Sequence, residues 1–288
     1  MHALLRTARP KQWLKNVLVF AGPGAAGVLD EPRQVGVTLL TFVALCAASS
    51  GTYFWNDVLD IEADRVHPTK RERPIATGAV SRSTAWVVGS VLALLGLGLA
   101  ASTGRWQTVA VVAAYLAITA TYSVVWKHIA VLDLVAVASG FVLRAAAGAV
   151  AVDVPMSTWF VLVTTFGSLY VVTGKRYAEQ RELGADAHMV RTTLGLYTAR
   201  YLSFVLAVTC TGALLSYCVW AFEVRDLSTS ALPWHELSIV PVLVAFLRYA
   251  LVLDQGHGAA PEEVFADDRV LQVTGLVWAV VFGLAIYA

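Results

Sequence analysis

Residues 34–64 read QVGVTLLTFVALCAASSGTYFWNDVLDIEAD, and this stretch decides how the rest of the chain is interpreted. Residues 34–55 contain no charged side chain, and a helix needs roughly 20 apolar residues to cross a bilayer. Carboxylates follow at once, at Asp57, Asp60 and Asp64. The stretch therefore predicts a transmembrane helix that ends in a cluster of oxygen-bearing side chains at the membrane surface.

The composition of the whole chain places it among membrane proteins. Of its 288 residues 58% are apolar and 14% are charged, whereas soluble domains average about 25% charged residues. We expect an all-α, polytopic helical bundle that forms a single domain over residues 1–288. Nine apolar stretches are candidates for transmembrane helices, near 13–29, 34–55, 81–102, 107–126, 129–151, 156–174, 193–221, 237–254 and 270–287.

The basic residues are distributed unequally between the two predicted membrane faces. Three fall on one face, namely Arg33, Arg105 and Arg225. Fifteen fall on the other face, namely Arg6, Arg9, Lys11, Lys15, Arg65, Lys70, Arg71, Arg73, Arg82, Lys127, Lys175, Arg176, Arg181, Arg191 and Arg269. Because loops rich in Lys and Arg stay inside the cell, we expect a plasma-membrane protein with a cytoplasmic N-terminus. No basic face is free of apolar segments, so nucleic acid is not an expected partner.

The acidic run favours a magnesium site on the cytoplasmic face. At about 100° per residue, Asn56, Asp57, Asp60 and Asp64 share an arc of about 100° on a helix. Hard oxygen ligands of this kind suit Mg²⁺, which usually keeps waters and also binds substrate phosphates. Lys70 and Arg73 would then neutralise a diphosphate leaving group, together with the metal. The alternative is a solvated loop of mixed charge.

Three further groups of residues are candidates for substrate binding. Lys175, Arg176 and Glu179 follow the sixth stretch and either form a second site or simply pair along a helix end. We expect the loops at about 56–80 and 175–192 to cap one active site. The remaining candidates carry isolated positive charges: Lys11 and Lys15, spaced to share one helix face; Lys127; and the intramembrane Arg144. Ordinary positive-inside anchoring is the alternative for the N-terminal lysines.

Several of these motifs resemble those of the UbiA superfamily of intramembrane prenyltransferases. RPKQWLKN (9–16), YFWNDVLDIEADRVHPTKRERPIATG (53–78), KHIAVLDLVAVASGFVLRAAAGA (127–149) and GKRYAE (174–179) are similar to one branch, the decaprenyl-phosphate phosphoribosyltransferases. The resemblance covers nearly the whole chain. Prenyl-transferring members usually carry a second Asp-rich motif after the sixth helix. Here a basic loop replaces it, which suits a donor with an additional phosphate.

The resemblance implies a function. Mg²⁺ held by Asp57, Asp60 and Asp64 would bind phosphoribosyl diphosphate (PRPP), and 5-phosphoribose would pass to a polyprenyl phosphate held in the lipid bilayer. Pyrophosphate would leave, and the product would serve cell-wall arabinan synthesis. Two alternatives stay open: prenyl transfer from a prenyl diphosphate to an aromatic acceptor, and a transporter. The sequence also leaves a homo-oligomer open.

Overall fold

The computed structural model describes residues 2–67, 69–183, 193–225, 232–258 and 260–287. These residues form helices and connecting segments without a strand, which confirms the all-α prediction. Two compact units are present, Met1–Pro155 and Met156–Ala288. A single transferase domain over the whole chain stays a prediction. Seven helices of the described residues are long and apolar enough to cross a membrane, so the expected count of nine is not confirmed.

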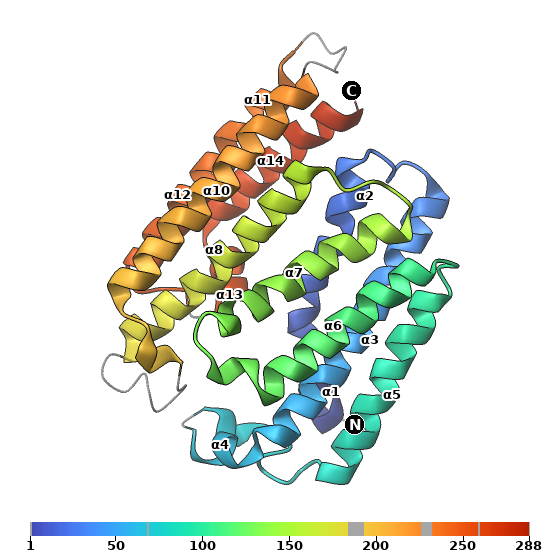
Figure 1. The fold of residues 1–288 in the computed structure, drawn as a ribbon, viewed down its shortest axis with the longest axis vertical. Coiled ribbons are helices and arrows are strands. Elements are labelled where there is room, and N and C mark those ends of the chain that lie inside the picture. Colours follow the sequence, from blue (N-terminus) through green and yellow to red (C-terminus); the bar gives the residue numbers. More distant parts are fainter. Residues whose placement is uncertain (1, 68, 184–192, 226–231, 259, 288) are drawn as a thin grey trace. The chain divides into compact units, whose positions relative to one another are not determined.

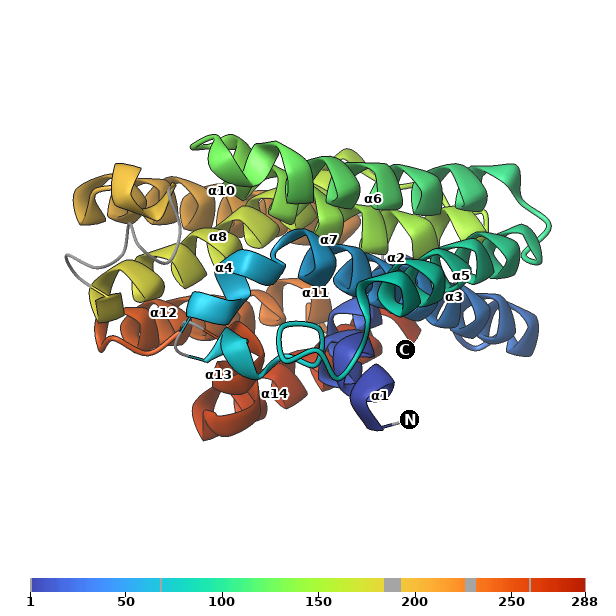
Figure 2. The same ribbon diagram turned by 90° about the horizontal axis from the view of Figure 1, so that it is seen from below.

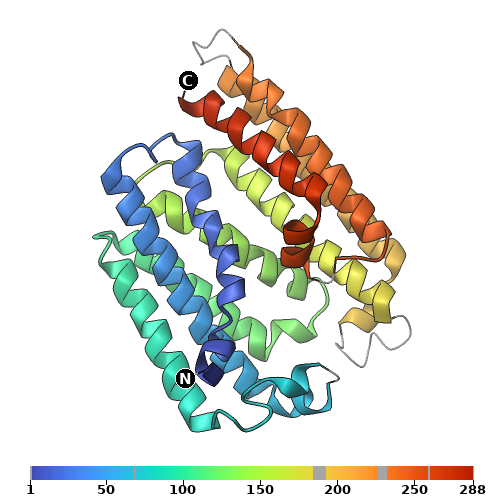
Figure 3. The same ribbon diagram turned by 180° about the vertical axis from the view of Figure 1, so that it is seen from behind.

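The first unit is built around the long helix α3 (Pro32–Leu59), which packs along α5 (Arg82–Ala101), as Figures 1 and 3 show. Next to them, α6 (Trp106–Val124) packs on α7 (Leu132–Ala151). The remaining elements are short: α1 (His2–Ala8), η1 (Pro10–Phe20), α2 (Ala21–Ala25), α4 (Ile61–Val66), η2 (Lys70–Glu72) and η3 (Trp126–His128). Figure 2 looks onto the end where α3 finishes, with α1 and α4 in the foreground.

The first expected span does not form one continuous transmembrane helix. Residues 10–25 form the 3₁₀ helix η1 and the five-residue α2, and neither is among the seven candidate spans. This segment packs on α7 at very short range, because a Cβ on Gly148 would lie 1.7 Å from the Val19 carbonyl oxygen. Glycine is therefore required at this crossing, as at other close helix contacts in membranes.

The second unit contains two pairs of packed helices. α8 (Thr158–Leu183) lies along α10 (Ala199–Arg225), and α12 (Ile239–Asp254) lies along α14 (Arg269–Tyr287). Short elements complete it: η5 (Leu194–Leu196), α11 (Trp234–Leu237) and α13 (Pro261–Asp267). α8 contains most of the sixth expected span but is not among the seven, because polar residues lower its mean hydropathy. The core of the second unit contains aromatic rings: Tyr170 of α8 stacks on Phe246 of α12, with 5.1 Å between the ring centroids.

Candidate functional site

The acidic run forms a slightly broken helix at the end of α3. α3 ends at Leu59, and Asp60 leaves helical geometry (φ −95°, ψ 6°) before α4 begins. Asp60 nevertheless keeps i to i−4 hydrogen bonds on both sides, from Asp60 N to Asn56 O (2.9 Å) and from Asp64 N to Asp60 O (2.8 Å). Asp60 is therefore the link between α3 and α4.

Asp57 and Asp64 converge on one cation. Arg73 Nη1 donates to Asp57 Oδ1 at 3.1 Å and to Asp64 Oδ2 at 2.7 Å. Arg9 Nη2 donates to the same Asp57 oxygen at 2.5 Å, and its guanidinium lies 4.8 Å from the centre of the Tyr53 ring. The two carboxylates are only 1% and 3% exposed. Buried charges need such partners, because an unpaired charge in a protein interior is very costly.

Asp60 points to a different partner. Its Oδ1 accepts a hydrogen bond from Lys127 Nζ, and its Oδ2 accepts one from Asn56 Nδ2 at 3.1 Å. Lys127 lies on η3, directly after α6, so the pair joins the ends of α3 and α6. The structure therefore arranges the predicted residues in two groups: Asp57 and Asp64 with Arg73, and Asn56 and Asp60 with Lys127.

Two oxygens of this group suit a hard cation. Asp57 Oδ1 and Asp64 Oδ2 both lie within hydrogen-bonding distance of a single nitrogen, so one ion could contact both. Carboxylate oxygens are the ligands that Mg²⁺ prefers. Within the described ranges no three His, Cys, Asp or Glu residues are arranged to hold a metal. The residues present fit a metal held by Asp57, Asp64 and substrate oxygens, whereas Asp60 faces Lys127 and its role as a third ligand stays a prediction.

Arg144 serves a buried polar network. It donates from Nε to Asn16 Oδ1 (2.7 Å), from Nη1 to Gly140 O (2.8 Å) and from Nη2 to Tyr115 OH (2.9 Å). Its guanidinium also lies over the rings of Tyr115 and Phe141, at 4.7 and 5.5 Å. These contacts tie η1, α6 and α7 together. A role for Arg144 in binding a substrate phosphate stays a prediction.

The expected geometry of Lys11 and Lys15 is wrong. The sequence suggested α-helical neighbours on one face, but both residues lie on the 3₁₀ helix η1. At three residues per turn, positions four apart differ by about 120° around the axis. The two lysines therefore do not share one face of η1. Lys11 is exposed and Lys15 is half-buried.

Lys175, Arg176 and Glu179 lie on α8 in the second unit. Arg176 Nη1 contacts Glu179 Oε2 at 2.8 Å, and Lys175 Nζ lies 3.8 Å from Glu179 Oε1. These are the local helix pairs that the sequence allowed as the alternative. Residues 184–192 of the expected cap lie outside the described residues. A site that includes both loops stays a prediction.

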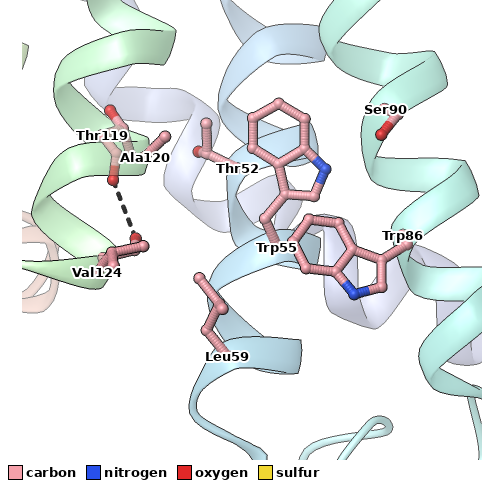
Figure 4. Close-up of a pocket in the computed structure, with 9 residues that line it drawn as sticks. Thr52, Trp55, Leu59, Trp86, Ser90, Thr119, Ala120 and Val124 are labelled. Atoms are coloured by element: carbon pink, nitrogen blue, oxygen red, sulfur yellow. Dashed lines mark hydrogen bonds between the residues drawn. The ribbon is translucent and has the colours of Figure 1, made fainter.

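An apolar groove lies between α3, α5 and α6 in the first unit (Figure 4). It has a volume of about 300 Å³, and the rings of Trp55 and Trp86 lie 6.4 Å apart on one side. Its other lining residues are Thr52, Leu59, Ser90, Thr119, Ala120, Ser123 and Val124. The hydroxyls of Thr52, Thr119 and Ser123 donate to carbonyls of their own helices, so they add little polarity to the groove.

Sequence reasoning missed two groups at this site. Arg9 was counted only as a cytoplasmic charge, although it contacts Asp57 across 48 positions of sequence. Its position in RPKQWLKN, beside the lysines that were chosen, was the available signal. Asn16, the buried partner of Arg144, is not among the residues that the sequence analysis singles out. Neither contact follows from local periodicity.

Comparison with known proteins gives consistent matches. A family model described as the UbiA prenyltransferase family matches residues 17–273. A decaprenyl-phosphate phosphoribosyltransferase of Corynebacterium glutamicum is 42% identical, over 99% of this chain and 86% of that protein. Its counterpart from Mycolicibacterium smegmatis is 40% identical, over 99% and 92%. A solved structure of a UbiA homologue from Archaeoglobus fulgidus, bound to GPP and Mg²⁺, has a TM-score of 0.74 at 18% identity and covers 99% of both chains.

Proposed function

Since the chain belongs to the UbiA prenyltransferase family, a family of multi-pass membrane proteins, we propose that it transfers 5-phosphoribose from PRPP to a polyprenyl phosphate such as decaprenyl phosphate. One observation carries this proposal. Relatives named decaprenyl-phosphate phosphoribosyltransferase are 40–42% identical over nearly the whole chain, and the chain covers 86% and 92% of the two described above. The product is a lipid-linked phosphoribose, a precursor for cell-wall arabinan, and pyrophosphate is released.

The reaction exchanges one bond at ribose C1. The bond from C1 to the diphosphate oxygen breaks, and a bond from C1 to an oxygen of the lipid phosphate forms. That attacking oxygen is already anionic, so it needs no strong general base. The main tasks of the enzyme are to orient the two substrates and to stabilise charge on the leaving pyrophosphate. The abundance of cations around Asp57 and Asp64 supports this assignment.

We place the donor diphosphate beside Asp57 and Asp64. These carboxylates would hold Mg²⁺, which supplies charge neutralisation to the leaving group when bound. Arg73 already contacts both carboxylates, so its guanidinium is positioned to reach a diphosphate oxygen next to them. Lys70 lies on the same short loop. Asp60 orients Lys127 and completes the site on the side of α6.

Lys127 is one candidate for binding the acceptor phosphate. The apolar groove offers room for the first isoprene units of the acceptor, because its lining reaches the Asp60–Lys127 pair along the chain. Leu59 directly precedes Asp60, and Val124 lies shortly before Lys127. Arg144, Lys11 and Lys15 are further candidates for the lipid phosphate. Lys175, Arg176 and Glu179 of the second unit are candidates for the ribose hydroxyls and the 5-phosphate. We place all of these groups, and the N-terminus, on the cytoplasmic face.

The decisive experiment supplies labelled donors to the purified protein in lipid nanodiscs. One reaction contains labelled PRPP, Mg²⁺ and decaprenyl phosphate, and the second contains a labelled prenyl diphosphate and an aromatic acid. We expect a labelled lipid-linked phosphoribose in the first and no labelled prenylated aromatic acid in the second, and expect chelation of Mg²⁺ to abolish the phosphoribose product. Label in the prenylated aromatic product instead would refute phosphoribosyl transfer.

A further inference from the structure

A second cavity lies beside Asp57, on the side where the N-terminal segment meets the loop after α4. Its volume is about 270 Å³. The lining residues are Arg6, Thr7, Arg9, Asp57, Thr69, Lys70, Arg73 and Pro74. We call it the basic pocket. It shares Asp57, Lys70 and Arg73 with the diphosphate site proposed above and extends that site towards the N-terminal segment.

The charges that line the basic pocket are unbalanced. Four of its eight lining residues are cationic, and Asp57 is the one carboxylate among them. A single oxygen of that carboxylate accepts hydrogen bonds from both Arg9 and Arg73. Within the described part of the chain, Arg6 forms no ion pair. A concave site with this excess of positive charge attracts an anion, and arginines suit phosphate because they donate several hydrogen bonds in a fixed fork.

The wall formed by the N-terminal segment is held in place by the transmembrane core. Ser50 Oγ of α3 donates to Ala8 O at 3.0 Å, and Trp13 Nε1 donates to the same hydroxyl at 3.0 Å. Arg9 follows in the left-handed region (φ 54°, ψ 63°), a rare conformation for a residue other than glycine. Such backbone persists where surrounding contacts impose it, and it often marks ligand sites. Here it directs the Arg9 side chain to Asp57.

We propose that the basic pocket binds a phosphate group of a substrate, with Arg6 and Arg9 as binding residues. The inference rests on the proposed function, which supplies two phosphate monoesters: the 5-phosphate of the donor and the phosphate of the acceptor lipid. Both offer the same chemistry to the pocket. In either case the bound phosphate lies next to Asp57, so the pocket fixes one substrate relative to the diphosphate held by the acidic pair.

Arg6→Gln is the informative variant, because Arg6 is exposed and its removal leaves the Asp57 contacts intact. The matched control is Arg71→Gln, which removes the same charge from an exposed position of the neighbouring loop that does not line the pocket. Binding of two probes, ribose 5-phosphate and a short prenyl phosphate, is measured by calorimetry on the full-length protein. Steady-state transfer is measured in parallel.

We expect Arg6→Gln to weaken binding of one probe at least tenfold relative to Arg71→Gln, and to raise the KM of the matching substrate by a similar factor. The affected probe identifies whether donor or acceptor supplies the phosphate. Arg6→Lys, which keeps the charge, should restore most of the binding. Equal binding of both probes by Arg6→Gln and Arg71→Gln would overturn the inference. Arg6-dependent phosphate binding in a protein that transfers no phosphoribose would overturn the proposed function alone.

Discussion

The end of α3 and the end of α8 both run from an apolar helix into charged residues, but their ion pairs are built differently. At the end of α3 the partners are distant in sequence: Arg9 reaches Asp57 across 48 positions and Lys127 reaches Asp60 across 67. At the end of α8, Lys175 and Arg176 pair with Glu179 within one helical turn. A local pair forms on any helix, whereas the first cluster exists only when the tertiary fold is complete. The first is therefore the better candidate for a catalytic centre.

The largest effect is expected at the convergent carboxylates. Asp57→Asn and Asp64→Asn should each lower kcat at least about 100-fold, the scale seen when one stabilising group is removed from an active site. The measurement is turnover of labelled PRPP at saturating Mg²⁺. Glu62→Gln is the matched control, because Glu62 lies on the same run but is 72% exposed and pairs outward with Arg82. Near-normal turnover by Asp64→Asn would contradict the metal assignment.

A smaller effect is expected at the pair that joins α3 to α6. Lys127→Gln should raise the KM for polyprenyl phosphate about tenfold, since a hydrogen bond from a charged group contributes about 1.5–3 kcal/mol. Removal of the Lys127 amine also leaves Asp60 without this cation. Asp60→Asn should therefore change the KM less in the Lys127→Gln background than in the unmodified protein. The four variants of this cycle are compared by KM for each substrate. Independent, additive effects would show that the pair does not act as a unit.

The apolar groove gives a test that depends on the length of the acceptor. Trp86→Ala removes a half-exposed indole from the groove and should raise the KM for a long-chain acceptor about three- to tenfold. For a prenyl phosphate too short to reach the indole, the KM should not change. Leu95→Ala is a suitable control, because Leu95 is an exposed residue of α5 that does not line the groove. Equal losses for both acceptors would exclude the groove as the tail site.

The smallest effect is expected in the second unit. Lys175→Gln removes a half-buried i,i+4 helix pair of the kind that contributes about 0.3–0.5 kcal/mol, so the thermal midpoint should fall by no more than about 2 °C. We expect the KM for PRPP to rise only about threefold. A loss of turnover as large as that of Asp57→Asn would show that the end of α8 contributes to catalysis as much as the end of α3.

The predictable part of the site was the part with helical periodicity. Asp57, Asp60 and Asp64 were identified because their spacing places them on one face, and two of them do converge on Arg73. Lys127 was named from its position at a span end, although its pairing with Asp60 could not be read from the chain. These residues needed only local rules and a membrane boundary.

The rest depended on contacts between distant segments. Arg9 looked like one of fifteen cytoplasmic charges until the fold placed it on Asp57. Lys11 and Lys15 were paired by α-helical spacing, but Arg9 and Pro10 start the segment as a 3₁₀ helix instead. The partner of Arg144 was missed because Asn16 lies 128 positions away. No periodic pattern encodes which segments will meet.

The contact between Asn16 and Arg144 has a consequence for how the protein is made. Residues 10–25 are not a candidate span, and their docking surface includes Gly148 and Arg144 of α7. At about 5–20 residues per second, a ribosome needs roughly 6–26 s to get from one residue to the other. The contacts of this segment with α3, from Trp13 to Ser50 and from Ser50 to Ala8, involve residues that are made well before α7. The N-terminal segment can therefore dock on α3 first, and the contact between Asn16 and Arg144 can form only after α7 has been made.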